Sequence, residues 1–131
     1  MTVRRYGTLF ILLHGTISLV HEISHRVIPV HLPPFQYVIA YLFVGVLPLV
    51  ALAMLWTPRS RGGLWLLFVS MAGSLVYAGT LHFVILHNPD HVSQIIESGW
   101  RPVFWSTAGL MAATEAFGCW LSVWLLRRSN D

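Results

Sequence analysis

The sequence predicts an all-α integral membrane protein, a four-helix bundle whose spans are joined by short loops. Of its 131 residues, 56% are apolar and 10% are charged, whereas soluble domains carry about 25% charged residues. Four apolar runs reach the roughly 20 residues that a helix needs to cross about 30 Å of hydrocarbon. They lack the period-two alternation of barrel strands, so helices must satisfy the backbone in lipid. We therefore expect one transmembrane domain, residues 1–131, surrounded by the lipid bilayer.

Each span has its own local signals. The first begins after two arginines, like a signal peptide, but His14 interrupts the apolar run and no cleavage motif follows, so we expect a retained helix. A proline-rich turn at 29–34 precedes the second span, which Pro48 is expected to kink or loosen. A basic turn at 57–62 and a longer polar loop at 87–102 separate the remaining spans. The predicted spans are Tyr6–Ile28, Phe35–Trp56, Gly63–Leu86 and Val103–Leu126.

Arginines set the predicted orientation. All eight basic residues are arginines, and cytoplasmic loops of membrane proteins are enriched in such residues. Most of them lie at the two chain ends and in the second loop, so both termini are expected in the cytoplasm and the protein in the cell membrane. This group is Arg4, Arg5, Arg59, Arg61, Arg127 and Arg128, with Arg26 and Arg101 on the opposite side.

The composition also excludes several classes of function. The sequence has no glycine-rich phosphate loop and no basic aromatic groove, so neither a nucleotide nor a nucleic acid is expected as a partner. Cys119 is the single cysteine, which rules out an intramolecular disulfide and a CxxC motif. Because four short helices expose apolar faces and carry little chain outside lipid, we expect other membrane subunits or further copies as partners.

A polar stripe runs along the first predicted helix. At about 100° per residue, His14, Ser18, His21 and His25 fall within roughly 60° of one another. Polar side chains are costly in lipid, so this stripe should face the bundle interior and mark a cavity, a binding site or a partner helix. Hydrogen bonding between helices, worth about 0.6 to 2 kcal/mol per contact, is the purely structural alternative.

Within the stripe, the segment His21 to His25 reads HEISH and matches HExxH. Two histidines one helical turn apart can bind zinc, and the glutamate between them can act as a general base on water. Over these five residues the chain resembles the zinc-binding helix of metalloproteases. The resemblance implies His21 and His25 as ligands and Glu22 as the catalytic residue.

Further ligands are expected from the outer end of the third helix and the loop after it. His82 lies at about the same depth as His21 and His25 when the rise of 1.5 Å per residue is counted from the inner ends. His87 and Asp90 follow in the loop. Imidazole and carboxylate groups suit zinc or copper(II). Haem b is the alternative, held by His82 together with His21 or His25.

A second buried polar feature is Glu115 in the fourth predicted helix, among small neighbours that allow close helix packing. A carboxylate there needs a partner. By depth His14 is the candidate, so we expect a His14–Glu115 hydrogen bond, either structural or part of a proton relay.

Three functions are compatible with these residues. The leading hypothesis is a small accessory subunit of a membrane complex with a histidine-rich metal or redox-cofactor site near the extracytoplasmic face. The second is a compact HExxH zinc-dependent membrane hydrolase with Glu22 as the base. The third is a bundle without a cofactor, in which the histidines are structural or sense pH. The sequence does not decide whether the protein is an enzyme.

Overall fold

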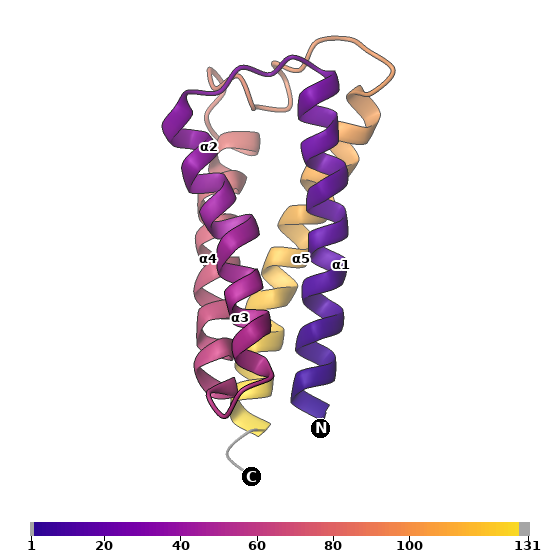
Figure 1. Cartoon of the computed structure of the whole chain (residues 1–131). Coiled ribbons are helices and arrows are strands. Elements are labelled where there is room, and N and C mark those ends of the chain that lie inside the picture. The colour runs from indigo at the N-terminus through magenta and orange to yellow at the C-terminus, as the bar shows by residue number, and fades with distance from the viewer. Residues whose placement is uncertain (1, 129–131) are drawn as a thin grey trace.

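The computed structural model, which describes residues 2–128, confirms the all-α prediction. Four spans have the length and apolar composition needed to cross a membrane. Both described chain ends lie at the same end of the molecule, as an even number of spans requires (Figure 1). The helices are α1 (Thr2–Val27), α2 (Pro34–Ala40), the π-helix η1 (Tyr41–Val46), α3 (Leu47–Leu55), α4 (Ser60–Phe83) and α5 (Arg101–Arg128).

The spans begin and end close to where the sequence predicted. The first helix begins at Thr2 rather than Tyr6, and the third span, which was expected to reach Leu86, stops at Phe83. There the backbone N–H groups of Val84 and Ile85 both donate to the carbonyl of Thr80, at 3.0 and 2.9 Å, and the chain turns into the loop. Helices commonly end in such tightened or shared bonds.

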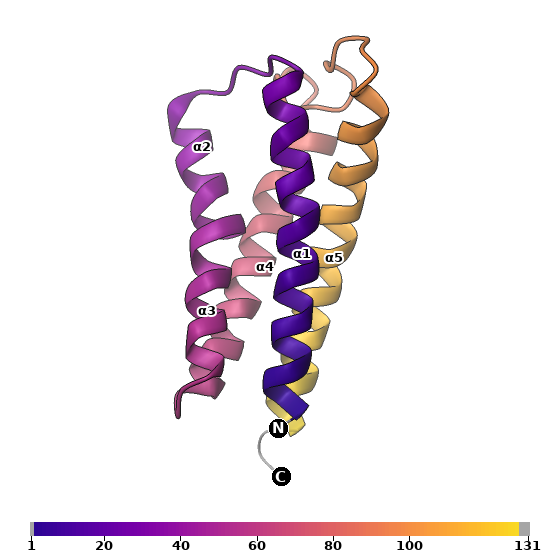
Figure 2. The ribbon, with the colours of Figure 1, turned by 45° about the vertical axis from the view of Figure 1, so that its right-hand side comes forward.

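The best-packed part of the bundle lies at the end that carries the chain termini. Helix α5 packs against α1 and α4, and α3 packs against α4 (Figures 1 and 2). Gly118 lets these helices approach, because a Cβ atom there would lie 2.5 Å from the Phe10 ring and 2.7 Å from Met71. The buried core residues are Phe10, Ile11, Ala51, Leu55, Leu64, Leu67, Met71, Leu121, Leu125 and Leu126.

The second span is loosened where Pro48 enters it, as predicted. The six residues of η1 end just before α3, which has Pro48 in its first turn. They form i→i+5 hydrogen bonds, such as the one from the Leu47 N–H to the Leu42 carbonyl. A proline has no N–H to donate to the carbonyl five residues earlier, that of Phe43. The Ser70 hydroxyl on α4 donates to that carbonyl instead, at 2.5 Å. The defect in one helix is thus satisfied by a neighbouring helix, as a membrane protein requires.

The opposite end is closed by loops. The chain between α4 and α5 folds back over the bundle, and the linker between α1 and α2 runs across the top beside it (Figure 2). A second, smaller core of Ile28, Val30, Ile95 and Phe104 holds these segments together. Trp105 fixes the loop further by donating its indole N–H to the Val92 carbonyl at 2.9 Å.

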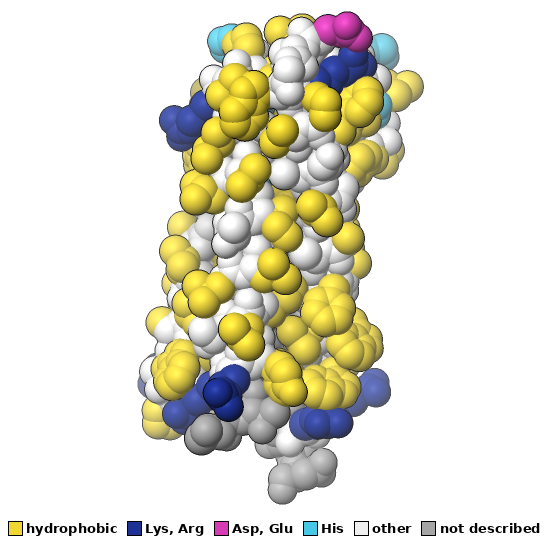
Figure 3. Space-filling view, turned by 90° about the vertical axis from the view of Figure 1, so that its right-hand side faces the viewer, with side chains coloured by type: hydrophobic (Ala, Val, Ile, Leu, Met, Phe, Trp, Pro, Cys, Tyr) yellow, Lys and Arg dark blue, Asp and Glu magenta, His cyan; other side chains and the backbone are white. Residues whose placement is uncertain are grey.

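The surface is consistent with lipid contact along the spans. Figure 3 shows apolar side chains covering the face between the two ends, with arginines near the ends and histidine and acidic side chains at the end away from the termini. Trp124 stacks under Arg128, with the guanidinium carbon 4.0 Å from the ring centre. Paired aromatic and basic side chains of this kind are typical of the membrane interface.

Candidate functional site

Four predicted site residues meet beneath the loops at the end away from the termini. His21 and His25 come from α1, His82 from the last turn of α4, and Asp90 from the following loop. We call these four residues the histidine cluster. His21, His82 and Asp90 are at most 5% exposed, and the side chain of His25 is 10% exposed. The structure therefore joins α1 and α4 as the sequence predicted.

His21 is oriented by a threonine on α5. Its Nδ1 lies 2.8 Å from Oγ1 of Thr107. The Thr107 hydroxyl in turn donates to the carbonyl of Val103 at 2.7 Å, one helical turn earlier. Since a hydroxyl has one hydrogen, we assign the remaining proton to His21 Nδ1, which donates to Thr107. The lone pair of neutral His21 is then on Nε2, the atom that faces the cluster.

His25 lies at the centre of the cluster. Its Nε2 is 3.1 Å from Nε2 of His21 and 3.2 Å from Oδ1 of Asp90. The rings of His21 and His25 meet edge to face, with their centres 4.7 Å apart. The Nε2 hydrogen of neutral His25 can therefore reach either the His21 nitrogen or the Asp90 carboxylate.

His82 and Asp90 hold each other in place. Nδ1 of His82 lies 3.0 Å from the backbone carbonyl of Asp90 and 3.3 Å from its Oδ2. A carbonyl only accepts, so Nδ1 carries the hydrogen. The loop reaches this position because the Val92 N–H donates to the His82 carbonyl at 3.0 Å, and the Asn88 side chain accepts the Asp90 N–H at 2.9 Å. These contacts insert the carboxylate between the two histidine-bearing helices.

Sequence reasoning missed the residue that forms the floor of the cluster. Phe104 of α5 is fully buried, and its ring centre lies 4.8 Å from that of His21, 5.0 Å from His25 and 5.7 Å from His82. It therefore packs against all three imidazoles. Neither Phe104 nor Thr107 belongs to a motif, so no signal in the sequence marked them.

The fifth predicted ligand, His87, and the predicted catalytic residue, Glu22, lie away from these contacts. His87 is exposed in the loop and lines a separate small hollow with His31. The Glu22 carboxylate is held by the Tyr41 hydroxyl, which donates at 2.8 Å, and by Arg26, whose guanidinium nitrogens lie 2.9 and 3.0 Å away.

The predicted hydrogen bond between His14 and Glu115 is wrong. Both side chains are 1% exposed, but His14 Nδ1 lies 3.1 Å from the Thr114 hydroxyl, and Glu115 accepts a hydrogen bond from Ser74. Thr114 and Glu115 are neighbours in sequence, so their side chains differ by about 100° around the helix. The depth estimate was correct, but it could not fix the rotation of α5.

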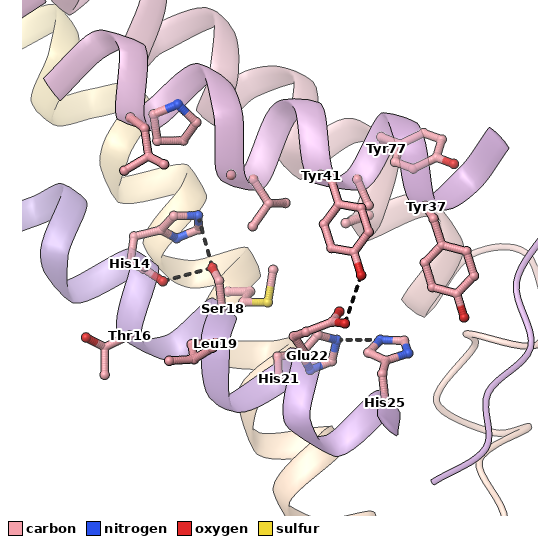
Figure 4. Close-up of a pocket in the computed structure, with 18 of the residues that line it drawn as sticks. His14, Thr16, Ser18, Leu19, His21, Glu22, His25, Tyr37, Tyr41 and Tyr77 are labelled. Carbon is pink, nitrogen blue, oxygen red and sulfur yellow. Dashed lines mark hydrogen bonds between the residues drawn. The ribbon is translucent and has the colours of Figure 1, made fainter. Parts of the chain in front are cut away.

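A large pocket begins at the histidine cluster and descends between α1 and the second span. Its volume is about 500 Å³. In Figure 4, His21 and His25 of α1 lie at the end of this space where Tyr37, Tyr41 and Tyr77 line the other side, and His14 lies further along α1. Several exposed apolar residues form its rim, among them Leu12, Leu19 and Leu49. The pocket therefore opens sideways, toward the surface that lipid covers.

Unpartnered polar atoms gather in the same place. Within residues 2–128, the buried side-chain polar atoms without a hydrogen bond are His25 Nδ1, Tyr77 Oη, Asp90 Oδ1, which makes only the 3.2 Å ion-pair contact with His25 Nε2, and Arg101 Nε. The first three belong to residues that line the pocket. A buried polar group without a partner costs about 1–3 kcal/mol, so this part of the molecule is suited to a ligand.

The histidine cluster is not a ready-made metal site. In the described part of the chain, no group of three or more histidine, cysteine, aspartate or glutamate side chains meets the geometry for holding a metal ion. The cluster nitrogens and oxygens are instead directed toward one another.

Comparison with protein-family models, curated protein sequences and solved structures gives no match for this chain.

Proposed function

We propose that this protein is a small membrane-embedded metal-binding protein, an accessory subunit whose site binds one transition-metal ion, zinc or copper(II), through His21, His25 and Asp90. The observation that carries the proposal is that one buried imidazole nitrogen lies beside both a second imidazole nitrogen and a carboxylate oxygen. His25 Nε2 lies 3.1 Å from His21 Nε2 and 3.2 Å from Asp90 Oδ1. Imidazole and carboxylate donors are the usual ligands of zinc and copper(II).

These separations are close to those of a tetrahedral zinc site. With zinc–ligand distances of 2.0–2.2 Å, adjacent ligand atoms in a tetrahedron are about 3.3–3.6 Å apart. Small side-chain rotations would therefore turn the three atoms from one another toward a shared ion. On binding, the ion would replace the hydrogen bond between the two histidines, and the Nε2 hydrogen of His25 would move to its Nδ1.

The neighbours of these ligands are those that a metal site needs. Histidine ligands usually donate their other ring N–H to a second group that fixes their orientation. Thr107 accepts that hydrogen from His21 at 2.8 Å, and His82 holds the carboxylate of Asp90 at 3.3 Å. We therefore assign His82 as the residue that positions Asp90, and we exclude the exposed His87 from the ligand set.

A single ion fits this arrangement better than haem b. The ring centres of His21 and His82 are 5.0 Å apart, with the rings at 87° in an edge contact. A haem would have to lie flat between two axial histidines, and this contact leaves no space for the macrocycle.

Binding is also better supported than hydrolysis. A general base must reach the water that it activates, but the Glu22 carboxylate is already held by Tyr41 and Arg26. Glu22→Gln tests this point. The variant should keep its metal, and an enzyme would lose turnover of any ester or peptide substrate found for the wild type.

Cobalt(II) offers a direct test of the proposed site. The wild-type protein, purified in mild detergent, should take up one Co²⁺ per chain with the strong visible absorption of a four-coordinate ion, and Zn²⁺ should displace it. His21→Ala and Asp90→Asn should each abolish this spectrum. Elemental analysis of the protein as purified identifies the metal that it acquires in the cell.

The exposed His87 supplies the matched control. His87→Ala removes an imidazole from the same end of the molecule but not from the cluster, so this variant should bind Co²⁺ like the wild type. Wild-type protein that is folded by circular dichroism but takes up no Co²⁺, Zn²⁺ or Cu²⁺ would refute the proposal.

A further inference from the structure

The pocket beside the histidine cluster is longer than a metal site needs. Its lining residues on α1 extend from Ile11 to His25, which corresponds to about 21 Å along the helix axis at 1.5 Å per residue. Polar side chains line the end near the cluster. Ile11, Leu49 and Leu52 line the far end together with His14, which is paired with Thr114. A pocket with one polar end and one apolar end, open toward lipid, has the shape of a site for an amphiphile.

Two glycines give this pocket its width. Gly15 on α1 and Gly45 on η1 lie on opposite walls. A Cβ atom added at either position would meet no other atom within 4 Å. Gly73 and Gly118, by contrast, are packed against neighbouring side chains. The space beside Gly15 and Gly45 is therefore open, and an apolar chain can enter it from the bilayer.

The polar end defines the head group. If His25 binds the ion through Nε2, its hydrogen moves to Nδ1, which has no partner within the described chain. The Tyr77 hydroxyl likewise lacks a partner there. Both atoms then offer hydrogens, so the matching head group is an oxygen acceptor. No arginine is among the described residues that line the pocket, and the carboxylates of Asp90 and Glu22 offset the charge of the bound ion, so a neutral head is favoured over an anionic one.

We propose that the slot between α1 and the second span binds a neutral, long-chain lipid with a carbonyl head, which enters sideways from the bilayer and places its oxygen between His25 and Tyr77. The head-group assignment rests on the proposed metal site, because it depends on the metal-bound form of His25. The slot itself rests on the open space at Gly15 and Gly45.

Photolabelling in lipid nanodiscs tests the proposal. The probe is methyl hexadecanoate with a diazirine in its chain, added to Zn²⁺-loaded wild-type protein, and labelled residues are located by peptide mass spectrometry. Label is expected on α1 and on the second span. Unmodified methyl hexadecanoate should compete, whereas hexadecane, which has no acceptor, and hexadecanoate, which is anionic, should compete poorly.

Glycine variants provide the matched pair. Gly45→Leu fills the slot and should reduce labelling about tenfold, while its Zn²⁺ content stays at the wild-type value. Gly109→Leu is the control, because that glycine also faces open space but does not line the pocket. Tyr77→Phe should reduce labelling about fivefold through loss of one hydrogen bond.

The outcomes separate the two proposals. Equal labelling of Gly45→Leu and wild type, or equal competition by hexadecane, overturns the lipid slot. Labelling that depends on Gly45 but not on added Zn²⁺ overturns the head-group assignment. Failure of the wild type to bind Zn²⁺ overturns the metal site instead, and metal analysis of the same preparation identifies that case.

Discussion

Thr107→Val tests the link between the orientation of His21 and metal affinity. In the wild type, His21 Nδ1 donates to the threonine oxygen at 2.8 Å. Without metal, His21 in the variant can move its hydrogen to Nε2 and donate within the cluster. Metal binding requires the lone pair of His21 to be on Nε2, so the ring hydrogen must be on Nδ1. In the variant this buried N–H has no acceptor. We expect the affinity for Zn²⁺ to fall 10–100-fold, the usual effect of removing such a partner, or about 1.4–2.7 kcal/mol.

The assay is a competitive Zn²⁺ titration against a chromophoric chelator. Thr107→Ser keeps the hydroxyl and should restore most of the affinity. Thr114→Val is the matched control, because Thr114 pairs with His14 in the same way, at 3.1 Å, but outside the cluster. An unchanged dissociation constant for Thr107→Val, or an equal loss for Thr114→Val, would refute the reasoning.

Three further predictions concern stability and topology. Ser74→Ala leaves the buried Glu115 without its hydrogen-bond donor and should lower the free energy of unfolding by about 1–3 kcal/mol, measured by denaturation in detergent. Gly118→Ala places a methyl group 2.5 Å from Phe10 and should cost about 1–3 kcal/mol. Gly109→Ala, in open space, should not destabilise, and a loss as large as that of Gly118→Ala would contradict the packing argument. A reporter fused to the C-terminus should be active in the cytoplasm, and activity only outside it would reverse the orientation that the arginines predict.

Much of the fold follows from hydropathy and length alone. Lipid admits few backbone conformations, so an apolar run of about 20 residues fixes both the type and the approximate bounds of a helix. The meeting of His21, His25 and His82 was also predictable, because helix rise alone gives their depth. The sequence even marked Pro48 as the point where the second span loosens.

The remaining features depend on long-range contacts. Asp90 comes from a loop whose path is set by hydrogen bonds to His82 and Asn88. The turn residues in the sequence predict a loop there, but they do not predict that the loop folds back onto His82. The partner of His14 depends on the rotation of α5, which one residue changes by about 100°. Phe104 and Thr107 became part of the site only because that rotation turned them toward α1.

The π-helix of the second span also has a consequence for how such a chain can change over evolutionary time. A π-helical turn is equivalent to one residue inserted into an α-helix, so it shifts the angular phase of everything before it by about 100° relative to everything after it. Tyr41 faces Glu22 on one side of this shift, while Leu49 and Leu52 line the pocket on the other. Deleting a single residue within Tyr41–Val46 would restore a regular helix and separate these two faces. Chains that share this site should therefore conserve the length of that segment more strictly than its residue types.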